Sequence, residues 1–295
     1  MSRARPSPTS GGPCDGFVLI AVLWILAALA TLVTIYSVHV SGAATAAAVR
    51  DEALLARALA TAGVELAAQR LAAVPKEVRP TRGDLAFRRG RARVLATFVN
   101  EAARIDLNAA PKELLAGLFV VLGAQPDDAD TYAERIVAWR APSGDATLER
   151  ERSRYREAGL DHGPRGKPFV HADELWLVLG IPPALIEQAL PHLTIYGGRP
   201  DVLARDADPV VLAALPGETP DGPAGNAPPL RRGTTPEGGD AVRVTVRIDF
   251  DRGGTRAAEA VILVRDFGDD PYRVLTWRDD LDTPPPLRPP QETRR

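Results

Sequence analysis

The stretch GFVLIAVLWILAALATLVTIYSVHV, residues 16–40, decides the fold because it is an apolar helix placed almost at the start of the chain. No Asp, Glu, Lys or Arg interrupts it, and roughly 20 apolar residues suffice to span a bilayer as a helix. Arg3 and Arg5 precede the tract and favour a cytoplasmic N-terminal side, which sends the remainder of the chain out. We therefore expect one transmembrane helix, from Phe17 to Val40.

The position of a glycine relative to this tract distinguishes it from a secretory signal peptide. Signal peptides are cut after their apolar core. Here Gly16 lies ahead of the core, so cleavage between Gly16 and Phe17 would leave the apolar segment at the new N-terminus. This layout is similar to that of type IV prepilin-like proteins, and the competing interpretation is an uncleaved signal anchor. The single cysteine, Cys14, falls inside the leader, so the mature chain would have no disulfide.

Composition and motifs argue against catalysis. The net charge of -2 gives no strong field that would draw the chain to nucleic acid or acidic lipid. No nucleophile motif or glycine-rich phosphate loop is present. The four histidines lack metal-ligand spacing; they are His39, His162, His171 and His192. We expect no enzyme, no catalytic residues and no required cofactor.

Helical character continues beyond the apolar tract. The sequence up to Ala73 is rich in Ala and Leu and has no proline before Pro75. A continuous helix from Phe17 to Ala73 would be on the order of 85 Å long. Apolar residues at three- and four-residue spacing predict the face that packs on a globular head. They are Leu54, Leu55, Ala58, Leu59, Ala62 and Leu66.

The rest of the chain alternates between strand and helix patterns. Strands are predicted around residues 94–98 and, with period two, at 242–250, 257–265 and 272–277, the last three as an antiparallel meander. Helices are predicted at 111–123, with Asn108 as the N-cap, at 127–140, from Asp173, and from Pro182-Pro183. Between them, residues 141–168 are expected to form a loop with a short helix. The fold class is α+β: a pilin-like long N-terminal helix packed on an antiparallel sheet, with an all-α domain inserted.

These patterns divide the chain into seven parts. They are a prepilin leader (residues 1–16), a transmembrane and assembly helix (17–73), the first part of an α/β head (74–103), an inserted α-helical domain (104–217), a flexible loop (218–240), the C-terminal strands of the head (241–280) and a disordered tail (281–295).

Four stretches together resemble the minor pseudopilin K (GspK) family of type II secretion systems. They are GFVLIAVLWILAALA from Gly16, NEAARIDLNAAPKELLAGLF from Asn100, ERIVAWR from Glu134 and YREAGLDHGPRGKPFVHADELWLVLGIPPALIEQALPHLTIYGG from Tyr155. The chain departs from the family at Arg152, Ser153 and Arg154, where an acidic cluster is common. A family element after Gly198 is also weakened, to DVLARDADPVVLAALPG.

The resemblance implies a subunit that caps the tip of a periplasmic pseudopilus and helps prime its assembly. It implies a prepilin peptidase that cuts after Gly16 and N-methylates Phe17, and the minor pseudopilins I and J as partners. It places the chain in the inner membrane as a single-pass protein with its head in the periplasm. Most prepilin-like proteins carry glutamate at the fifth mature position, where this chain has Ala21. Protein K typically lacks that glutamate, because a tip subunit has no subunit above it to pair with.

Two alternatives remain open at this point. IDLNAAPKELL and ELWLVLGIPPALI resemble helix-hairpin-helix segments, which would make the chain a membrane-anchored DNA-uptake protein. Residues 104–195 carry 10 Lys and Arg against 14 Asp and Glu, which disfavours DNA, and we expect no nucleic acid partner. Calcium is the second alternative, because some family members bind it. The candidate ligands are Asp266, Asp269 and Asp270, or Asp249 and Asp251, and an ordinary turn is the competing interpretation.

Overall fold

The computed structural model describes residues 15–142, 144, 146–216, 233–251, 253–266 and 270–279. The predicted leader up to position 14, most of the predicted loop 218–240 and the tail 281–295 lie outside the described residues. The structure divides into two units, with the boundary between Ala56 and Arg57.

One long helix, α1 (Asp15–Ala72), contributes to both units, and the predicted helix from Phe17 to Ala73 is thereby confirmed. In the first unit its apolar segment is exposed; Trp24, for example, is 75% exposed. The hydroxyls of Thr31 and Thr34 donate to backbone carbonyls one turn earlier, at 2.8 Å in both cases. Both threonine hydroxyls are therefore satisfied within the helix itself.

In the second unit, the part of α1 from Arg57 packs on a sheet through small side chains. Its buried residues are Leu59, Ala60, Gly63, Val64, Ala67, Ala68 and Leu71. The predicted apolar face is therefore wrong except at Leu59: Leu54, Leu55 and Leu66 are exposed. The physical reason is that the backbone of α1 lies very close to the sheet at Gly63. A Cβ at Gly63 would lie 3.0 Å from both Cγ atoms of Val246, so the sheet selects the alanine and glycine stripe over the leucines.

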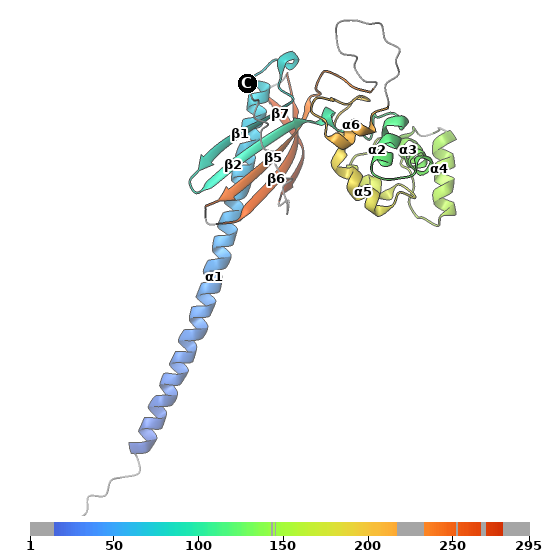
Figure 1. Cartoon of the computed structure of the whole chain (residues 1–295). Helices are drawn as coiled ribbons and strands as arrows, with labels where there is room; N and C mark the ends of the chain where they lie inside the picture. Colours follow the sequence, from blue (N-terminus) through green and yellow to red (C-terminus); the bar gives the residue numbers. More distant parts are fainter. Residues whose placement is uncertain are drawn as a thin grey trace, which may run out of the picture. The chain divides into compact units, whose positions relative to one another are not determined.

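Five antiparallel strands form the sheet in the order β1-β2-β5-β6-β7 (Figure 1). They are β1 (Arg82–Arg89), β2 (Ala92–Asn100), β5 (Ala241–Phe250), β6 (Thr255–Val264) and β7 (Tyr272–Asp279). The last three form the predicted meander. Sequence patterning did not separate β1 as a strand of its own, because only Leu85 and Phe87 interrupt its polar and arginine-rich residues. The chain leaves the sheet after Asn100 and returns to it at Ala241. A helical module is therefore inserted between β2 and β5, which are adjacent strands of the sheet.

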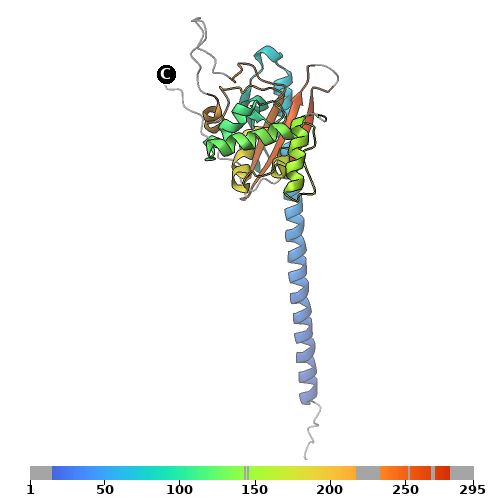
Figure 2. The ribbon, with the colours of Figure 1, turned by 90° about the vertical axis from the view of Figure 1, so that its right-hand side faces the viewer.

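The helical module consists of short helices around one core. They are α2 (Lys112–Val121), α3 (Pro126–Arg140), α4 (Ala146–Glu157), α5 (Pro183–Ala189) and α6 (Pro209–Ala214), with the 3-10 turns η2 (Glu101–Ala103), η3 (Ala172–Leu177) and η4 (Leu190–His192). Figure 2 shows α2, α3 and α4 from the side that faces right in Figure 1. A two-residue parallel pairing of β3 (Ile105–Asp106) with β4 (Leu193–Thr194) joins the beginning of the module to a later part of it. A further 3-10 turn, η1 (Lys76–Val78), follows α1.

Aromatic side chains fill the module core. Trp139 is 1% exposed and stacks on Phe169 with ring centroids 6.0 Å apart. The Tyr155 hydroxyl donates to Leu177 O at 3.1 Å and accepts from Leu179 N at 2.7 Å. Burial raises the pKa of Tyr155 to about 12, so this hydroxyl stays protonated and keeps both bonds at physiological pH.

Two local predictions in the module are wrong. Asn108 is not the N-cap of α2, which begins at Lys112 after Pro111 without a side-chain cap. The Asn108 amide instead binds the backbone of Phe169, with Oδ1 2.7 Å from its N and Nδ2 3.0 Å from its O. The helix predicted from Asp173 is the 3-10 turn η3. The helix predicted to stop at Gly123 does so, with that residue at φ +100°.

We predict that Gly117→Ala destabilises the module. A Cβ at this position would lie 2.2 Å from Ala214 O, so α2 and α6 would have to separate. Overpacking of this kind costs about 1–3 kcal/mol, which exceeds the roughly 1 kcal/mol gain in helix propensity. The measurement is the thermal unfolding midpoint, which should fall.

The matched control is Gly163→Ala. Its added Cβ would meet Tyr155 at an ordinary 3.8 Å, and Gly163 does not have a positive φ. An unchanged midpoint for Gly117→Ala would contradict the close packing of α2 on α6.

Candidate functional site

The first functional element is the apolar segment of α1. Leu19–Ser37 is the helical stretch, among the described residues, that is long and apolar enough to cross a membrane. No part of it is buried against protein. An uncovered apolar helix of this length would be costly in water and is stable in hydrocarbon. These features fit a single-pass membrane-anchored protein.

The predicted processing residues lie at the beginning of α1. Gly16 and Phe17 fall in its first turn, directly after Asp15. Ala21 follows one turn later and is half-buried. Cleavage after Gly16 and N-methylation of Phe17 stay predictions.

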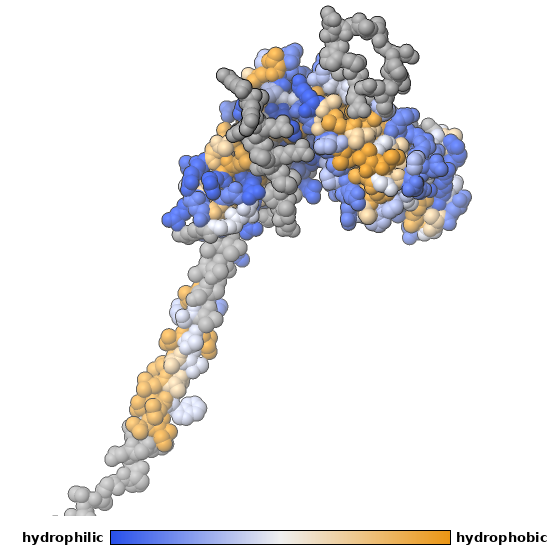
Figure 3. Space-filling view, viewed as in Figure 1, coloured by the Kyte–Doolittle hydropathy of each residue, from blue (hydrophilic) through white to orange (hydrophobic). Residues whose placement is uncertain are grey.

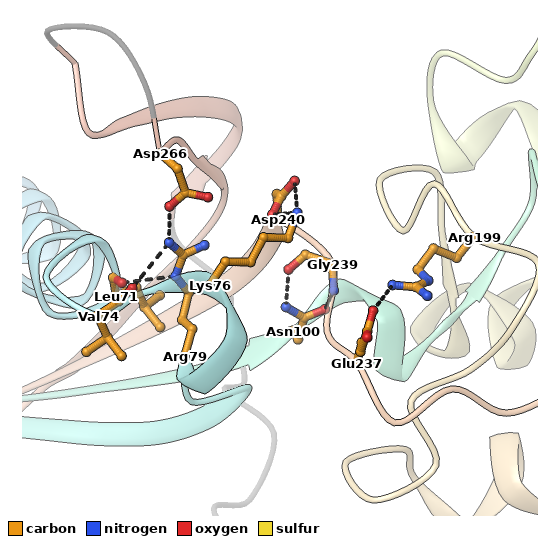
Figure 4. Close-up of polar contacts among 10 residues, drawn as sticks. All are labelled: Leu71, Val74, Lys76, Arg79, Asn100, Arg199, Glu237, Gly239, Asp240 and Asp266. Carbon is orange, nitrogen blue, oxygen red and sulfur yellow. Dashed lines mark hydrogen bonds and ion pairs between the residues drawn. The ribbon is translucent and has the colours of Figure 1, made fainter. Parts of the chain in front are cut away.

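The second element is the end of α1, where one of the predicted calcium ligands, Asp266, lies. Asp266 forms an ion pair with Arg79, whose guanidinium also donates to Leu71 O at 3.0 Å (Figure 4). The same guanidinium reaches Val74 O, so it satisfies two terminal carbonyls of the helix region. Asp266 therefore holds the Arg79 guanidinium against the carbonyls at the end of the helix. The acidic turn around Asp266 in the sequence did not predict this role.

The other candidate calcium ligands do not join Asp266. Asp269 lies outside the described residues, and Asp270 is exposed. No group of three His, Cys, Asp or Glu residues comes together anywhere in the described part of the chain. Calcium binding stays a prediction, and Arg79 already supplies a positive charge to Asp266.

The third element is the joint between the sheet and the helical module. Asn100, the last residue of β2, accepts from Gly239 N at 2.9 Å and donates to Gly239 O at 2.7 Å (Figure 4). Its Oδ1 also accepts from Ala102 N at 3.0 Å, which caps η2. One side chain thus clamps the outgoing chain to the returning one. Nearby, Lys76 pairs with Asp240 at 2.7 Å and adds a contact from the segment after α1.

Glu101, the next residue, is 1% exposed and is the most deeply buried charge at the joint. Its carboxylate accepts from Arg243 Nε at 2.7 Å and Nη2 at 3.2 Å, and from the hydroxyl of Thr194. Arg243 also pairs with Glu259 of β6. The network therefore links β5 and β6 of the sheet with η2 and β4 of the module.

The electrostatics of this pair decide its charge state. Burial alone would raise the pKa of Glu101, but the Arg243 charge and the hydrogen bonds hold it below its usual range. Burial also works against the charged form of Arg243, and the two carboxylates outweigh it, so the pKa of Arg243 is raised. Both groups are ionised at neutral pH, so the joint contains a buried ion pair.

Two polar residues in IDLNAAP, Asp106 and Asn108, connect the beginning of the module to its later parts. Asp106 accepts from Asn108 N at 2.7 Å and Gly198 N at 2.6 Å, which ties the beginning of the module to its later part. Burial raises the pKa of Asp106, and these backbone donors partly offset the rise. With Asn108 bound to Phe169, the segment holds two distant parts of the chain. Sequence patterns identified the segment and missed these roles, because Phe169 and Gly198 each lie more than 50 residues away.

Part of the chain matches a known protein family. Residues 95–198 match the family described as type II secretion system (T2SS), protein K. The predicted resemblance to protein K is confirmed. The match begins in β2 and contains Glu101, Asp106, Asn108 and Thr194, so it covers the outgoing side of the joint and most of the helical module. The protein K family is a structural component of a secretion system.

The solved structures support the fold. The chain is similar to one in the GspK–GspI–GspJ complex of the type 2 secretion system of enterotoxigenic Escherichia coli, with a TM-score of 0.57 and 16% identity. The similarity covers 78% of this chain and 97% of that chain. It confirms the predicted α+β class. A search of curated proteins gives no match.

We predict that Glu101→Gln loosens the joint and that the effect depends on pH. Removing one partner of a buried ion pair leaves Arg243 undercompensated, at a cost of about 3 kcal/mol at pH 7. The pKa of Glu101 is lower in the folded than in the unfolded chain. The ionised carboxylate therefore stabilises the fold above its unfolded pKa of about 4.3, and this contribution is lost as pH falls through the folded pKa.

The measurement is urea unfolding of wild type and variant between pH 7 and pH 3. The two free energies of unfolding should converge as the wild-type carboxylate becomes protonated. Glu157→Gln, at an exposed position of α4, is the matched control and should behave as wild type throughout. A constant difference between wild type and Glu101→Gln across the range would contradict the ionised pair.

Proposed function

We propose that the chain is a minor pseudopilin of a type II secretion system that caps the tip of the periplasmic pseudopilus and helps prime its assembly. The observation that carries the proposal is the combination in one chain of a protein K module and a helix with an exposed apolar segment. The helix that packs on the sheet after Arg57 is the same helix that carries Leu19–Ser37. A head built on such a helix can be stored in the inner membrane and drawn from it during assembly.

The predicted partners are the minor pseudopilins I and J and the prepilin peptidase. The similar solved chain comes from a complex with GspI and GspJ, which supports the first part. Ala21 supports a position at the tip, since a glutamate there would need the N-terminal ammonium of a neighbouring subunit. The inserted module enlarges the head and leaves less room for another subunit above it.

The DNA-uptake alternative meets two physical obstacles. In the first hairpin-like segment, the N-terminal turn of α3 presents Asp127 and Asp128, both exposed, where phosphate would have to approach. In the second, Pro182 and Pro183 begin α5, and proline has no N–H to donate to phosphate. We therefore keep protein secretion as the proposed function.

We predict that Gly16→Leu blocks processing. A peptidase that cuts after Gly16 must admit that residue at its active site, and a branched side chain fills the space. Wild type co-expressed with the peptidase should lose 16 residues and begin with N-methyl-phenylalanine, as read by mass spectrometry and N-terminal sequencing. The variant should keep its leader.

Gly12→Leu is the matched control, because it makes the same change four residues earlier and should be processed normally. An intact leader on wild type in the presence of peptidase would favour a plain signal anchor and overturn the proposal.

We also predict that the amount of this chain sets pseudopilus length. A subunit that blocks further addition ends a filament, so a rising ratio of this chain to the major pseudopilin should give shorter filaments in electron micrographs. Gly16→Leu at the same expression level should leave length unchanged, because the unprocessed subunit would not enter filaments. Labelled copies distributed along the filament shaft would contradict the tip position.

A further inference from the structure

The turn between β1 and β2 carries four arginines around Gly90. Arg88 donates to Asp251 and is thereby paired. The other three, Arg89, Arg91 and Arg93, are exposed, and their side chains make no hydrogen bond or ion pair with any residue that the structure describes. We call these three the arginine hairpin. In Figure 3 this end of the sheet is strongly hydrophilic.

This arrangement is unfavourable within the chain itself. Arg88 and Arg93 are directly opposite each other on the two antiparallel strands, and like charges in that position destabilise a sheet. Asp249 lies opposite Arg93 on the other side, in β5. Its carboxylate is engaged elsewhere, by Arg247 Nε at 3.1 Å and the Thr255 hydroxyl at 2.7 Å. The positive charge of the hairpin is therefore left without a partner among the described residues.

Edge protection does not account for the whole feature. Charged residues on an edge strand prevent unwanted pairing, and β1 is an edge strand, so Arg88 and Arg89 have that explanation. Arg91 lies in the turn, and Arg93 lies in β2, which is paired on both sides. Two of the three unpaired arginines thus protect no edge.

The surroundings indicate which kind of partner fits. Lipid-binding clusters contain about four to eight basic residues, whereas this one has three. Nucleic acid needs many phosphate contacts and gains from exposed aromatic residues, and the aromatic residues of β1 and β2, Phe87 and Phe98, are half-buried and buried. Asp249 and Asp251 lie at the same end of the sheet, each paired with an arginine, so this end carries charges of both signs. A protein surface carries both signs of charge and suits this mixed rim.

We propose that the arginine hairpin binds an acidic surface on another protein. The hairpin supplies three exposed guanidiniums that can pair with carboxylates, and the pairing relieves the repulsion between Arg88 and Arg93. The interaction is electrostatic and exposed, so it weakens as salt is raised. It does not depend on the proposed role at a pseudopilus tip.

The experiment places a photo-crosslinking amino acid at Ala86 of the full chain in its native membrane. Ala86 is exposed and lies two residues before Arg88, on the same face of β1. We expect irradiation to give an adduct whose partner peptide, identified by mass spectrometry, is rich in Asp and Glu. The charge-reversal variant R89E/R91E/R93E should lower the adduct yield about tenfold, as should 0.5 M salt applied to isolated membranes.

The matched control is R82E/R150E/R273E, which changes the same charge at three scattered exposed arginines and should leave the adduct unchanged. If the reversal variant fails to accumulate, R89Q/R91Q/R93Q takes its place and should lower the yield by a smaller factor. An adduct with lipid or nucleic acid only, no adduct, or a protein adduct that charge reversal does not reduce would overturn the proposal. An intact leader at Gly16 together with a charge-dependent adduct would remove the proposed function and keep this one.

Discussion

The buried pair of Glu101 and Arg243 is the constraint on which the arrangement of the second unit depends. Glu101 follows the last residue of β2, and Arg243 is the third residue of β5, so the pair lies where the helical module leaves and rejoins the sheet. A buried carboxylate without a partner is costly. The pair therefore fixes both the register of β5 and the point at which the helical module is attached to the sheet. A slip of β5 by one residue would turn Arg243 toward the α1 face and leave Glu101 unpaired.

Close approach of backbones is the second organising feature, and small residues provide it in both halves of the unit. Gly63 allows α1 to lie against Val246 of the sheet, and Gly117 allows α2 to lie against the end of α6. In each case the added Cβ of any other residue would meet a neighbour at 3.0 Å or less. These contacts are short-ranged and depend on shape, whereas the joint depends on charge.

The sequence predicted elements whose signal is local. Period two identified β5, β6 and β7, and proline and glycine punctuation identified α2, α3 and α5. It failed where the deciding partner is distant in the chain. Asn108 has the form of a cap residue and binds Phe169 instead. Asp266 has the form of a metal ligand and pairs with Arg79. The joint was contained in a recognised motif, but the partner of Glu101 lies 142 residues away, beyond the reach of any spacing rule.

The face of α1 that the sequence predicted to be buried is exposed in the structure, and this difference has a physical consequence. Leucine is the stronger hydrophobic signal, so periodicity selected Leu54, Leu55 and Leu66, yet these residues are 68%, 44% and 43% exposed. The sheet packs against the face that contains Gly63 and three alanines, because a Cβ at Gly63 would lie 3.0 Å from Val246. The helix thus carries two kinds of apolar surface, a small-residue stripe used within the chain and leucines that the chain leaves in solvent. Exposed leucines gain nothing for an isolated subunit, whereas burial of each against another helix would contribute about 1.5–3 kcal/mol. The fold of the single chain therefore gives these leucines no packing role.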